Sequence, residues 1–442
     1  MAHNLSRIGR VVLTPQASYE DASKATSTQI INAAGSVECE ATAPEPTVEL
    51  FERVALRGDF HQLPPIVGSP HGATITLRQP LPGLSSTVPT GNVAVGAGPP
   101  AAGGVLGAYQ WGGPGSGGPE TVGFKDSSNG TIAGGTTALI KVKGTTDLNS
   151  WGVGSALIVK DTAAGYQMSF IRSKDEDGSN NDLVPIVPLA VAPAEDEAIW
   201  GTSTAYLTST PAVKAVAMVW RSSQTASQLV LQGCVPTSYK IVMDPKARLM
   251  IETTFTINRI VADTATELPL SYLYTAPEIP PCYGNNGARL AFLNGSASTA
   301  FDVESLELTI DQEYQPQLSH GSATGVGDLV VTNRAVSLST TVLLGQAHPW
   351  DVSAGGVPML EPTNSATTQS RAIQLTCGSQ PGRMFGMLCP SPILSDVSIV
   401  DRNGIYAQQL TITPGNHTGD TPADPTDSMD VAANSDFRMA WG

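Results

Sequence analysis

Apolar and polar residues alternate with a period of two along several stretches of the chain, the pattern of β-strands buried on one side. Within residues 249–257, Ile251 and Phe255 lie on one side, and polar residues stand between them. Residues 73–81 and 335–343 alternate in the same way. We therefore predict sheets with one apolar core face and one wet, hydroxyl-rich face.

Signals for helices are few. Residues 348–360 (HPWDVSAGGVPML) could hold one short helix with Pro349 near its start, although two adjacent glycines weaken it. The 44 glycines and 33 prolines are typical of many short strands joined by turns. The predicted architecture is therefore mainly antiparallel β.

Two stretches resemble copies of one strand–turn–strand unit. Residues 229–257 (the first repeat) align with residues 384–412 (the second repeat) at a shift of 155 positions, which places Cys234 over Cys389. Turn signals separate two β-rich runs at similar points in both. A duplicated β unit suggests a protomer that presents one surface twice, as in ring and tube assemblies.

A weaker repeat lies upstream of each unit. Residues 47–60 and 73–81 align with residues 303–314 and 335–343, at a shift of 261 for the strand pair 73–81 and 335–343. The larger shift implies about 106 extra residues (261 − 155) between the two halves of the first copy, and so an insertion.

Gly/Pro-rich stretches suggest the boundaries of domains. We predict an N-terminal arm (1–44), a discontinuous first β domain (45–101 and 208–262), an inserted β domain (102–207), a linker (263–284), a second β domain (285–413) and a C-terminal arm (414–442). Four short strands within the insertion resemble a small independent barrel, at residues 138–142, 155–160, 166–172 and 182–189.

Charge argues against a protein that grips nucleic acid. The 442-residue chain has a formal net charge of −15, and only 14% of its residues are charged. Binding of phosphate needs Lys and Arg, whereas an acidic surface still lets DNA slide past without sticking. No run of apolar residues approaches the length of a membrane span.

The five cysteines are odd in number and form no CxxC, so we interpret them as small buried hydrophobes in a reducing cytoplasm. The first residues lack an apolar signal-peptide core, so we expect no secretion and regard the three glycosylation sequons as incidental.

No motif for catalysis, a cofactor or a metal stands out. Residues 113–118 match GxGxxG, but no clear strand precedes them and no helix follows. Residues 175–182 resemble a calcium loop in composition but lack its ligand spacing, so we expect a hairpin tip. The six histidines have no zinc-site spacing, and no GxSxG occurs. The six tryptophans either line a sugar groove or, more commonly in β domains, fill the core.

Several runs together resemble the major tail tube proteins of long-tailed bacteriophages. The first is residues 46–81, PTVELFERVALRGDFHQLPPIVGSPHGATITLRQPL, with a Pro-Pro pair before a strand. The second is residues 224–257, which contain the hairpin GCVPTSYKI…LMIETTFTI. The downstream runs YLYTAPEIPPCYGNNGARLAFLNG and SDVSIVDRNGIYAQQLTI also fit, so the resemblance covers most of 45–82 and 208–413.

The resemblance implies two tandem tail-tube-type β-barrel or sandwich domains, with the insertion decorating the outside. The protein would be a non-enzymatic virion component, made in the host cytoplasm, that polymerises as stacked rings into the tail tube through which the genome is ejected. Its partners would be itself, as a homotrimer with pseudo-sixfold symmetry or a hexamer, the tape-measure protein, and the tail terminator and distal tail proteins. DNA would pass without specific binding, and no cofactor, metal or membrane is implied.

The wet faces of the predicted strands would then line the lumen. The residues are Thr74, Thr76, Arg78, Glu252, Thr254, Thr256, Ser337, Ser339, Thr341, Gln409 and Thr411. Two alternatives remain open: a cell-surface or carbohydrate-binding β-sandwich protein, and a β-rich enzyme. The first predicts a secretory signal or clustered exposed aromatics, and the second predicts convergent catalytic groups.

Overall fold

The fold is known from a computed structural model. It describes residues 9–16, 25–33, 35–37, 40–42, 44, 50–51, 66–67, 73–80, 111–112, 120–121, 130–143, 154, 156–163, 165–176, 180–207, 215–222, 228–243, 249–263, 266–268, 288–294, 297–301, 303–319, 326–343, 371–379, 381, 384–402, 404–415 and 437–441. The chain is mainly β, with several antiparallel sheets and one barrel, as the alternation predicted.

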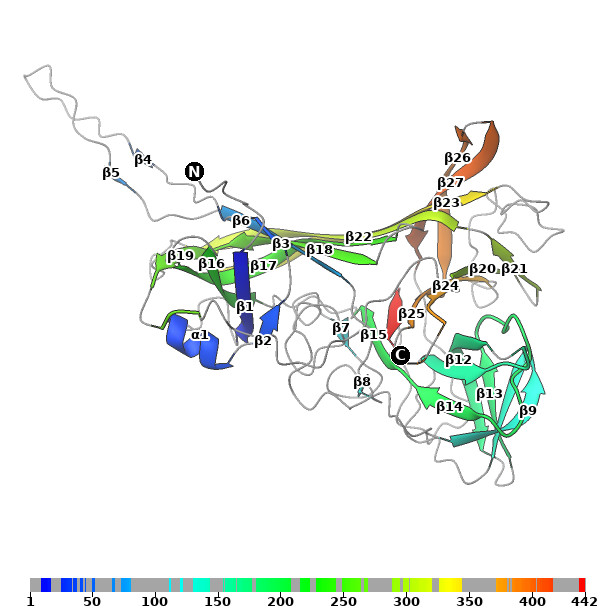
Figure 1. Ribbon diagram of the computed structural model, residues 1–442. Coiled ribbons are helices and arrows are strands. Elements are labelled where there is room, and N and C mark those ends of the chain that lie inside the picture. The colour runs from blue at the N-terminus through cyan, green and yellow to red at the C-terminus, as the bar shows by residue number, and fades with distance from the viewer. Residues whose placement is uncertain are drawn as a thin grey trace, which may run out of the picture.

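A twelve-stranded sheet, here the long sheet, runs along the molecule (Figure 1). Its main path is β2 (Gly35–Val37), β1 (Gly9–Gln16), β16 (Ala215–Ser222), β17 (Gln228–Met243), β22 (Val303–Leu318), β23 (Val326–Leu343), β27 (Ile405–Pro414) and β26 (Pro392–Arg402). Beside this path lie β18 (Met250–Ile257), β6 (Ala73–Pro80), β3 (Glu40–Ala41) and β19 (Arg259–Ala262).

An eight-stranded sheet, here the inner sheet, packs beneath the long sheet. Its strands are β21 (Ala297–Phe301), β20 (Arg289–Asn294), β24 (Arg371–Cys377), β25 (Phe385–Cys389), β28 (Arg438–Trp441), β15 (Ser203–Leu207), β7 (Trp111–Gly112) and β8 (Glu120–Thr121). Strands from the predicted second domain, the insertion and the C-terminal segment thus share one sheet.

A six-stranded barrel forms the third layer. It consists of β9 (Gly130–Thr136), β10 (Leu139–Lys143), β13 (Asn180–Pro185), β12 (Tyr166–Glu176), β11 (Ala156–Lys160) and β14 (Ala198–Gly201). The predicted hairpin in residues 175–182 is confirmed, because Asp175 pairs with Asp182 across β12 and β13. A separate pair joins β4 (Leu50–Phe51) and β5 (Ile66–Val67).

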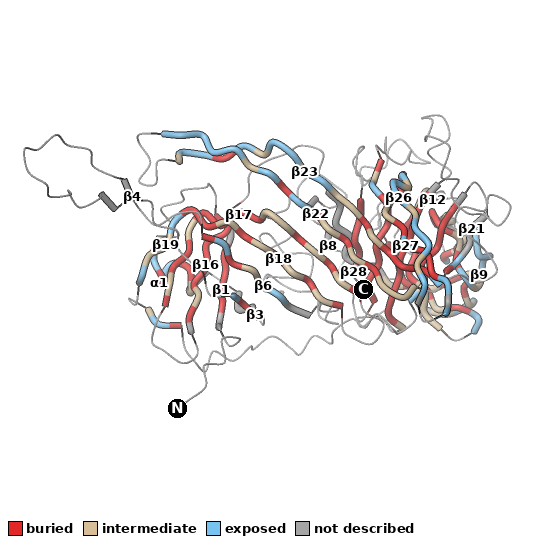
Figure 2. The backbone as a smooth tube through the Cα atoms, turned by 90° about the horizontal axis from the view of Figure 1, so that it is seen from above, coloured by how far each residue is buried: buried red, intermediate tan, exposed pale blue. Residues whose placement is uncertain are grey.

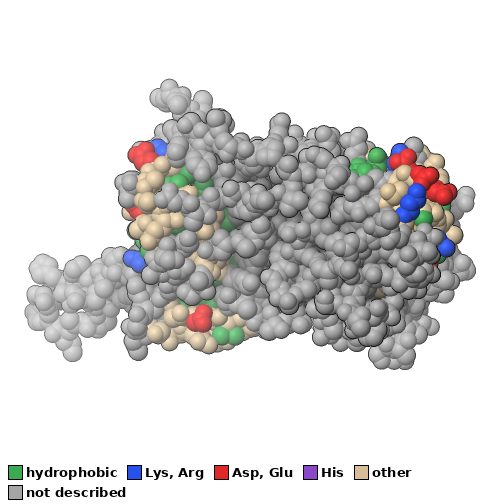
Figure 3. Space-filling view, turned by 90° about the horizontal axis from the view of Figure 1, so that it is seen from below, with side chains coloured by type: hydrophobic (Ala, Val, Ile, Leu, Met, Phe, Trp, Pro, Cys, Tyr) green, Lys and Arg blue, Asp and Glu red, His purple; other side chains and the backbone are tan. Residues whose placement is uncertain are grey.

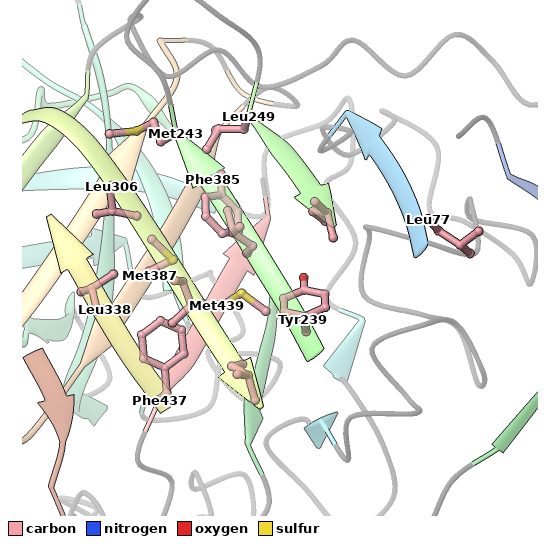
Figure 4. Close-up of a cluster of buried hydrophobic side chains, with 14 of the residues drawn as sticks. Leu77, Tyr239, Met243, Leu249, Leu306, Leu338, Phe385, Met387, Phe437 and Met439 are labelled. Atoms are coloured by element: carbon pink, nitrogen blue, oxygen red, sulfur yellow. The ribbon is translucent and has the colours of Figure 1, made fainter. Parts of the chain in front are cut away.

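The inner sheet is buried on both faces, so its strands lack the polar alternation of the long sheet. Phe292, Met387 and Met439 face the long sheet in the largest core cluster, part of which Figure 4 shows. The alternate residues Leu293, Leu388 and Ala440 face the barrel in a second cluster. The three layers are therefore joined by two apolar interfaces.

A short helix, α1 (Ser27–Ala33), covers the other side of β1 and β16. Ile30 is fully buried there against Val12 and Val219. The segment lies in the predicted N-terminal arm, which also contains β1. The candidate helix at 348–360 and the GxGxxG match at 113–118 lie outside the described residues.

The two repeats correspond in part, because β17 shifted by 155 positions falls on β25 in the inner sheet and on β26 in the long sheet. Strand β16 shifted by 155 positions falls on β24, and β18 falls on β27. Strand β6 pairs with β18 as β23 pairs with β27. Each hairpin carries a bulge whose hydroxyl donates across to a carbonyl, from Thr237 to Thr254 at 3.2 Å and from Ser395 to Thr411 at 3.0 Å.

The hairpin of β22 and β23 extends past the rest of the long sheet (Figure 2). Strand β17 pairs with β22 only as far as Asp311, and the residues of β22 beyond it are mostly exposed. Leu318, near the end of the described hairpin, is 83% exposed.

Candidate functional site: the polar face of the long sheet

The face of the long sheet that points away from the inner sheet is lined by polar side chains, and we call it the polar face. Figure 2 views the long sheet from above, with buried, intermediate and exposed residues along its strands. Its residues lie in rows, because directly paired residues of neighbouring strands point to the same side. One row joins Arg78, Glu252, Lys240, Thr309 and Ser337 across β6, β18, β17, β22 and β23.

All eleven residues predicted to share a wet face lie on this one face. Glu252, Thr254 and Thr256 pair with the three predicted residues of β6. Across β23 and β27, Ser339 pairs with Thr411 and Thr341 pairs with Gln409. Ten of the eleven are partly or largely exposed, whereas Thr341 is only 4% exposed. Thr341 therefore contributes little to the accessible surface of the polar face.

Hydroxyl groups of the polar face bond to one another across the strands. The Oγ1 atoms of Thr76 and Thr254 lie 3.0 Å apart. The hydroxyl of Ser238 donates to the Asp311 carboxylate at 2.6 Å. These contacts hold part of the hydroxyl surface in place between paired strands.

Cations on this face have carboxylate partners. Lys240 Nζ lies 2.7 Å from Glu307 Oε1, and Arg78 Nε lies 4.0 Å from Glu252 Oε2. These pairs are partly exposed, so each stabilises the fold by no more than about 1 kcal/mol. Asp311 and Asp396, which pairs with Thr411 on this face, add two further carboxylates, so carboxylates outnumber cations among the described side chains of the polar face.

The central strands of the polar face were missed in the sequence. Ser238, Lys240, Glu307, Thr309 and Asp311 lie on β17 and β22 between the two predicted sets. The signal was present, because each alternates with buried residues along its strand. Applying the period-two pattern to β17 and β22 as well would have predicted these five residues.

The described residues show no other concentration of reactive groups. No group of three or more His, Cys, Asp or Glu in this part of the chain could hold a metal ion. Cys234, Cys377 and Cys389 are buried free thiols, and burial raises the pKa of Cys377 to about 12. Such thiols stay protonated near neutral pH and are poor nucleophiles. All six histidines lie outside the described residues.

The two tryptophans whose side chains the structure describes, Trp200 and Trp220, both pack against the core. Trp200 packs against the core and makes an edge-to-face contact with Tyr166, with ring centroids 5.4 Å apart. Trp220 is also packed against the core. These two residues fit the core interpretation rather than a sugar groove.

Figure 3 shows the opposite side of the molecule, where the described charges at the barrel end stand close together. Lys143 lies 2.5 Å from Asp196, and Lys160 lies 2.6 Å from Glu197. Hydrogen bonding to Glu197 raises the pKa of Lys160. At this end of the described structure, Lys143 and Lys160 are each paired with a carboxylate.

No known protein-family model matches the chain, and no curated protein matches its sequence. Among the described residues no helix has the length and apolar character needed to cross a membrane.

Proposed function

We propose that the protein is a structural component of a long-tailed bacteriophage that polymerises as stacked rings into the tail tube. The polar face of the long sheet would line the channel. The observation that carries this proposal is the continuity of that face, which crosses β6, β18, β17, β22, β23 and β27 in one sheet.

The chemistry of the face suits the passage of DNA. Hydroxyl groups would keep the wall hydrated, and Arg78 and Lys240 are already paired with carboxylates. Tight binding of DNA needs several Lys or Arg contacts to phosphate. A face whose described side chains include more carboxylates than cations, on a chain of net charge −15, repels phosphate instead.

The internal repeat supports a ring. A chain with two corresponding units would form a trimer with pseudo-sixfold symmetry, each repeat occupying one of six similar positions. Two tandem tube-type domains and a homotrimeric ring belong to this proposal, with a simple hexamer as the other ring size. The tape-measure protein would occupy the lumen before DNA, and tail terminator and distal tail proteins would cap the tube. The protein would be made in the host cytoplasm and reside in the virion tail.

Negative-stain electron microscopy of the purified chain tests this proposal. We expect rings, or tubes as wide as a phage tail, with a central channel, and light scattering should show mass rising with protein concentration. A strictly monomeric species at high concentration, with no rings or tubes even beside its virion partners, would contradict it.

A further inference from the structure

The side of β1 and β16 that faces away from the main core is apolar and lies under two short segments. Its residues, here the apolar strip, are Val12, Ala217, Val219 and the neighbouring Val230 of β17, and none is more than 2% exposed. One covering segment is α1, which packs beside β1 and β16 at one end of the molecule (Figure 1). The other consists of residues 263 and 266–268, which follow β19 and which we call the strap. Ile30 of α1 and Leu268 of the strap complete the cluster over the apolar strip.

Two buried polar side chains fix the strap to the sheet. Gln228 of β17 is 2% exposed, and its Nε2 donates to two strap carbonyls at 2.9 and 2.8 Å, while its Oε1 accepts from the Leu268 N–H at 2.7 Å. Arg221 of β16 is 7% exposed and donates to the Leu268 carbonyl and, at 3.0 Å, to the Glu267 carboxylate. Backbone groups that are removed from water need such partners, so these two side chains hold the strap in place.

The strap in turn holds the first turn of α1. The Ser27 N–H donates to the Asp263 carboxylate at 2.7 Å, and the Ser27 hydroxyl accepts from the Thr266 N–H at 3.1 Å. The hydroxyls of Thr28 and Thr266 lie 2.5 Å apart. The first N–H groups of a helix have no partner within the helix, and a carboxylate beside them is favourable. The two segments therefore stabilise each other, although Ser27 and Asp263 are 236 positions apart in the chain.

Strand β24, which corresponds to β16 at the shift of 155, has a much larger cover on the same side. Ala217 falls on Ala372, and Ala372 lies in the cluster between the inner sheet and the barrel. A six-stranded barrel thus closes this face of β24, whereas α1 and the strap close it over β16.

The cover over β16 is small and depends strongly on polar contacts. The seven residues of α1 are too few to be stable without packing. Opening would exchange the hydrogen bonds of α1 and the strap for bonds to water, so each bond contributes only modestly to closure. Separating the barrel from the inner sheet would instead expose a broad apolar interface.

We propose that α1 and the strap form one lid, which opens and closes as a unit over the apolar strip, with Gln228 as its clamp. Local openings of this kind occur in cooperative units and cost less than global unfolding. Opening would expose Val12, Val219 and Val230 to solvent, and closing would seal them again. The lid is a property of the single chain, so it goes beyond the proposed function and does not depend on it.

Native-state hydrogen exchange of the full chain tests whether the two segments open together. Amides that are released by one opening share one protection factor. The hydrogen-bonded amides of Ile30 and Leu268 report on α1 and on the strap, and that of Ile186 reports on the barrel. We expect one protection factor for Ile30 and Leu268, and a higher one for Ile186. Unequal factors for Ile30 and Leu268, or factors as high as that of Ile186, would overturn the proposal.

A change in either segment should also loosen the other. Gln29→Ala removes the cap of α1, and Gln228→Leu removes the clamp of the strap. Each variant should lower the protection of both segments by about tenfold, because hydrogen bonds that favour closure are lost.

Gln167→Leu is the matched control for the clamp. Gln167 also makes three hydrogen bonds to one backbone segment, residues 190–191 of the barrel. Its loss should loosen that segment and leave the protection of α1 and the strap unchanged. If Gln29→Ala loosens α1 but not the strap, the two segments open independently and the single lid is wrong.

A reversible disulfide between the two segments gives a readout that gains a contact. Thr28→Cys with Thr266→Cys places two thiols where the hydroxyls lie 2.5 Å apart, close to the S–S bond length of about 2.05 Å. Cys39→Ser and Cys282→Ser remove the two cysteines outside the described residues, so that neither competes. After oxidation we expect slow exchange in both segments even when Gln29→Ala is present, and fast exchange again after reduction. Fast exchange of α1 in the oxidised protein would overturn the proposal.

Discussion

At the scale of the residue, neighbours on β18 have opposite environments. Phe255 is 0% exposed in the main core, whereas Thr254 lies on the polar face and bonds to Thr76. Phe255→Ala should lower the free energy of unfolding by about 3–5 kcal/mol, because it leaves a cavity. Thr254→Ala, the matched control, should cost no more than about 1.5 kcal/mol, the worth of one hydrogen bond. Urea unfolding measures both, and similar losses would contradict the assignment of faces.

Period-two alternation predicted these residue faces well, because a strand between core and solvent must alternate. Leu249, Ile251, Phe255 and Ile257 are all 0% exposed, as expected. The sequence could not show that Thr341 is covered or that Ile399 and Tyr406 are exposed. The exposure of these three side chains depends on which strand or segment lies beside their own strand. The sequence of a strand does not reveal which strand lies next to it.

At the scale of the element, α1 was missed although a signal was present. Thr26 and Gln29 form a T-x-x-Q capping box, in which Gln29 Oε1 accepts from the Thr26 N–H at 3.1 Å. The helix has seven residues, too few to be stable without packing. Its apolar contacts are Ile30, buried between β1 and β16, and the partly buried Ile31 beside it. Two adjacent apolar residues give no period of 3.6 to recognise in the sequence.

Ile30→Ala should therefore release α1 and destabilise the protein by about 2–5 kcal/mol. Gln29→Ala should cost about 0.5–2 kcal/mol, since it removes only the cap. Hydrogen exchange should show faster exchange in residues 27–33 for both variants and little change in the barrel. Unchanged exchange in the Ile30 variant would show that α1 is held by other contacts.

The insertion was expected to be an outer decoration, and four of its strands were located correctly. The barrel, however, buries Ala291, Leu293 and Leu388 of the inner sheet. Gly386 lies at this interface, where an added Cβ would be 2.6 Å from Met168 Sδ. The packing of one layer on another is a long-range property, so the composition of the insertion did not reveal it.

Replacing residues 130–201 with a short Gly/Ser linker is geometrically simple, because Gly130 pairs with Ile199 and the cut ends are close. We expect the shortened chain to aggregate and bind a hydrophobic dye, because an apolar face becomes exposed. Adding Leu293→Thr and Leu388→Thr should restore solubility. A soluble, stable deletion without those changes would show that the interface is dispensable.

At the scale of the whole molecule, the polar face predicts how the proposed tube would treat DNA. Thr254→Lys with Gln409→Lys adds two positive charges to the polar face. Both positions are accessible on the polar face and away from the core, so tubes should still assemble. Each added cation that reaches phosphate strengthens DNA binding, most strongly at low salt, where screening is weak. Tubes of this variant should retain DNA at low salt and release it as salt rises, and virions carrying it should eject DNA more slowly.

The matched control, Ala138→Lys with Thr162→Lys, adds the same charge at exposed positions of the barrel. Equal DNA retention by the two variants would show that the polar face does not line a channel, even if tubes form.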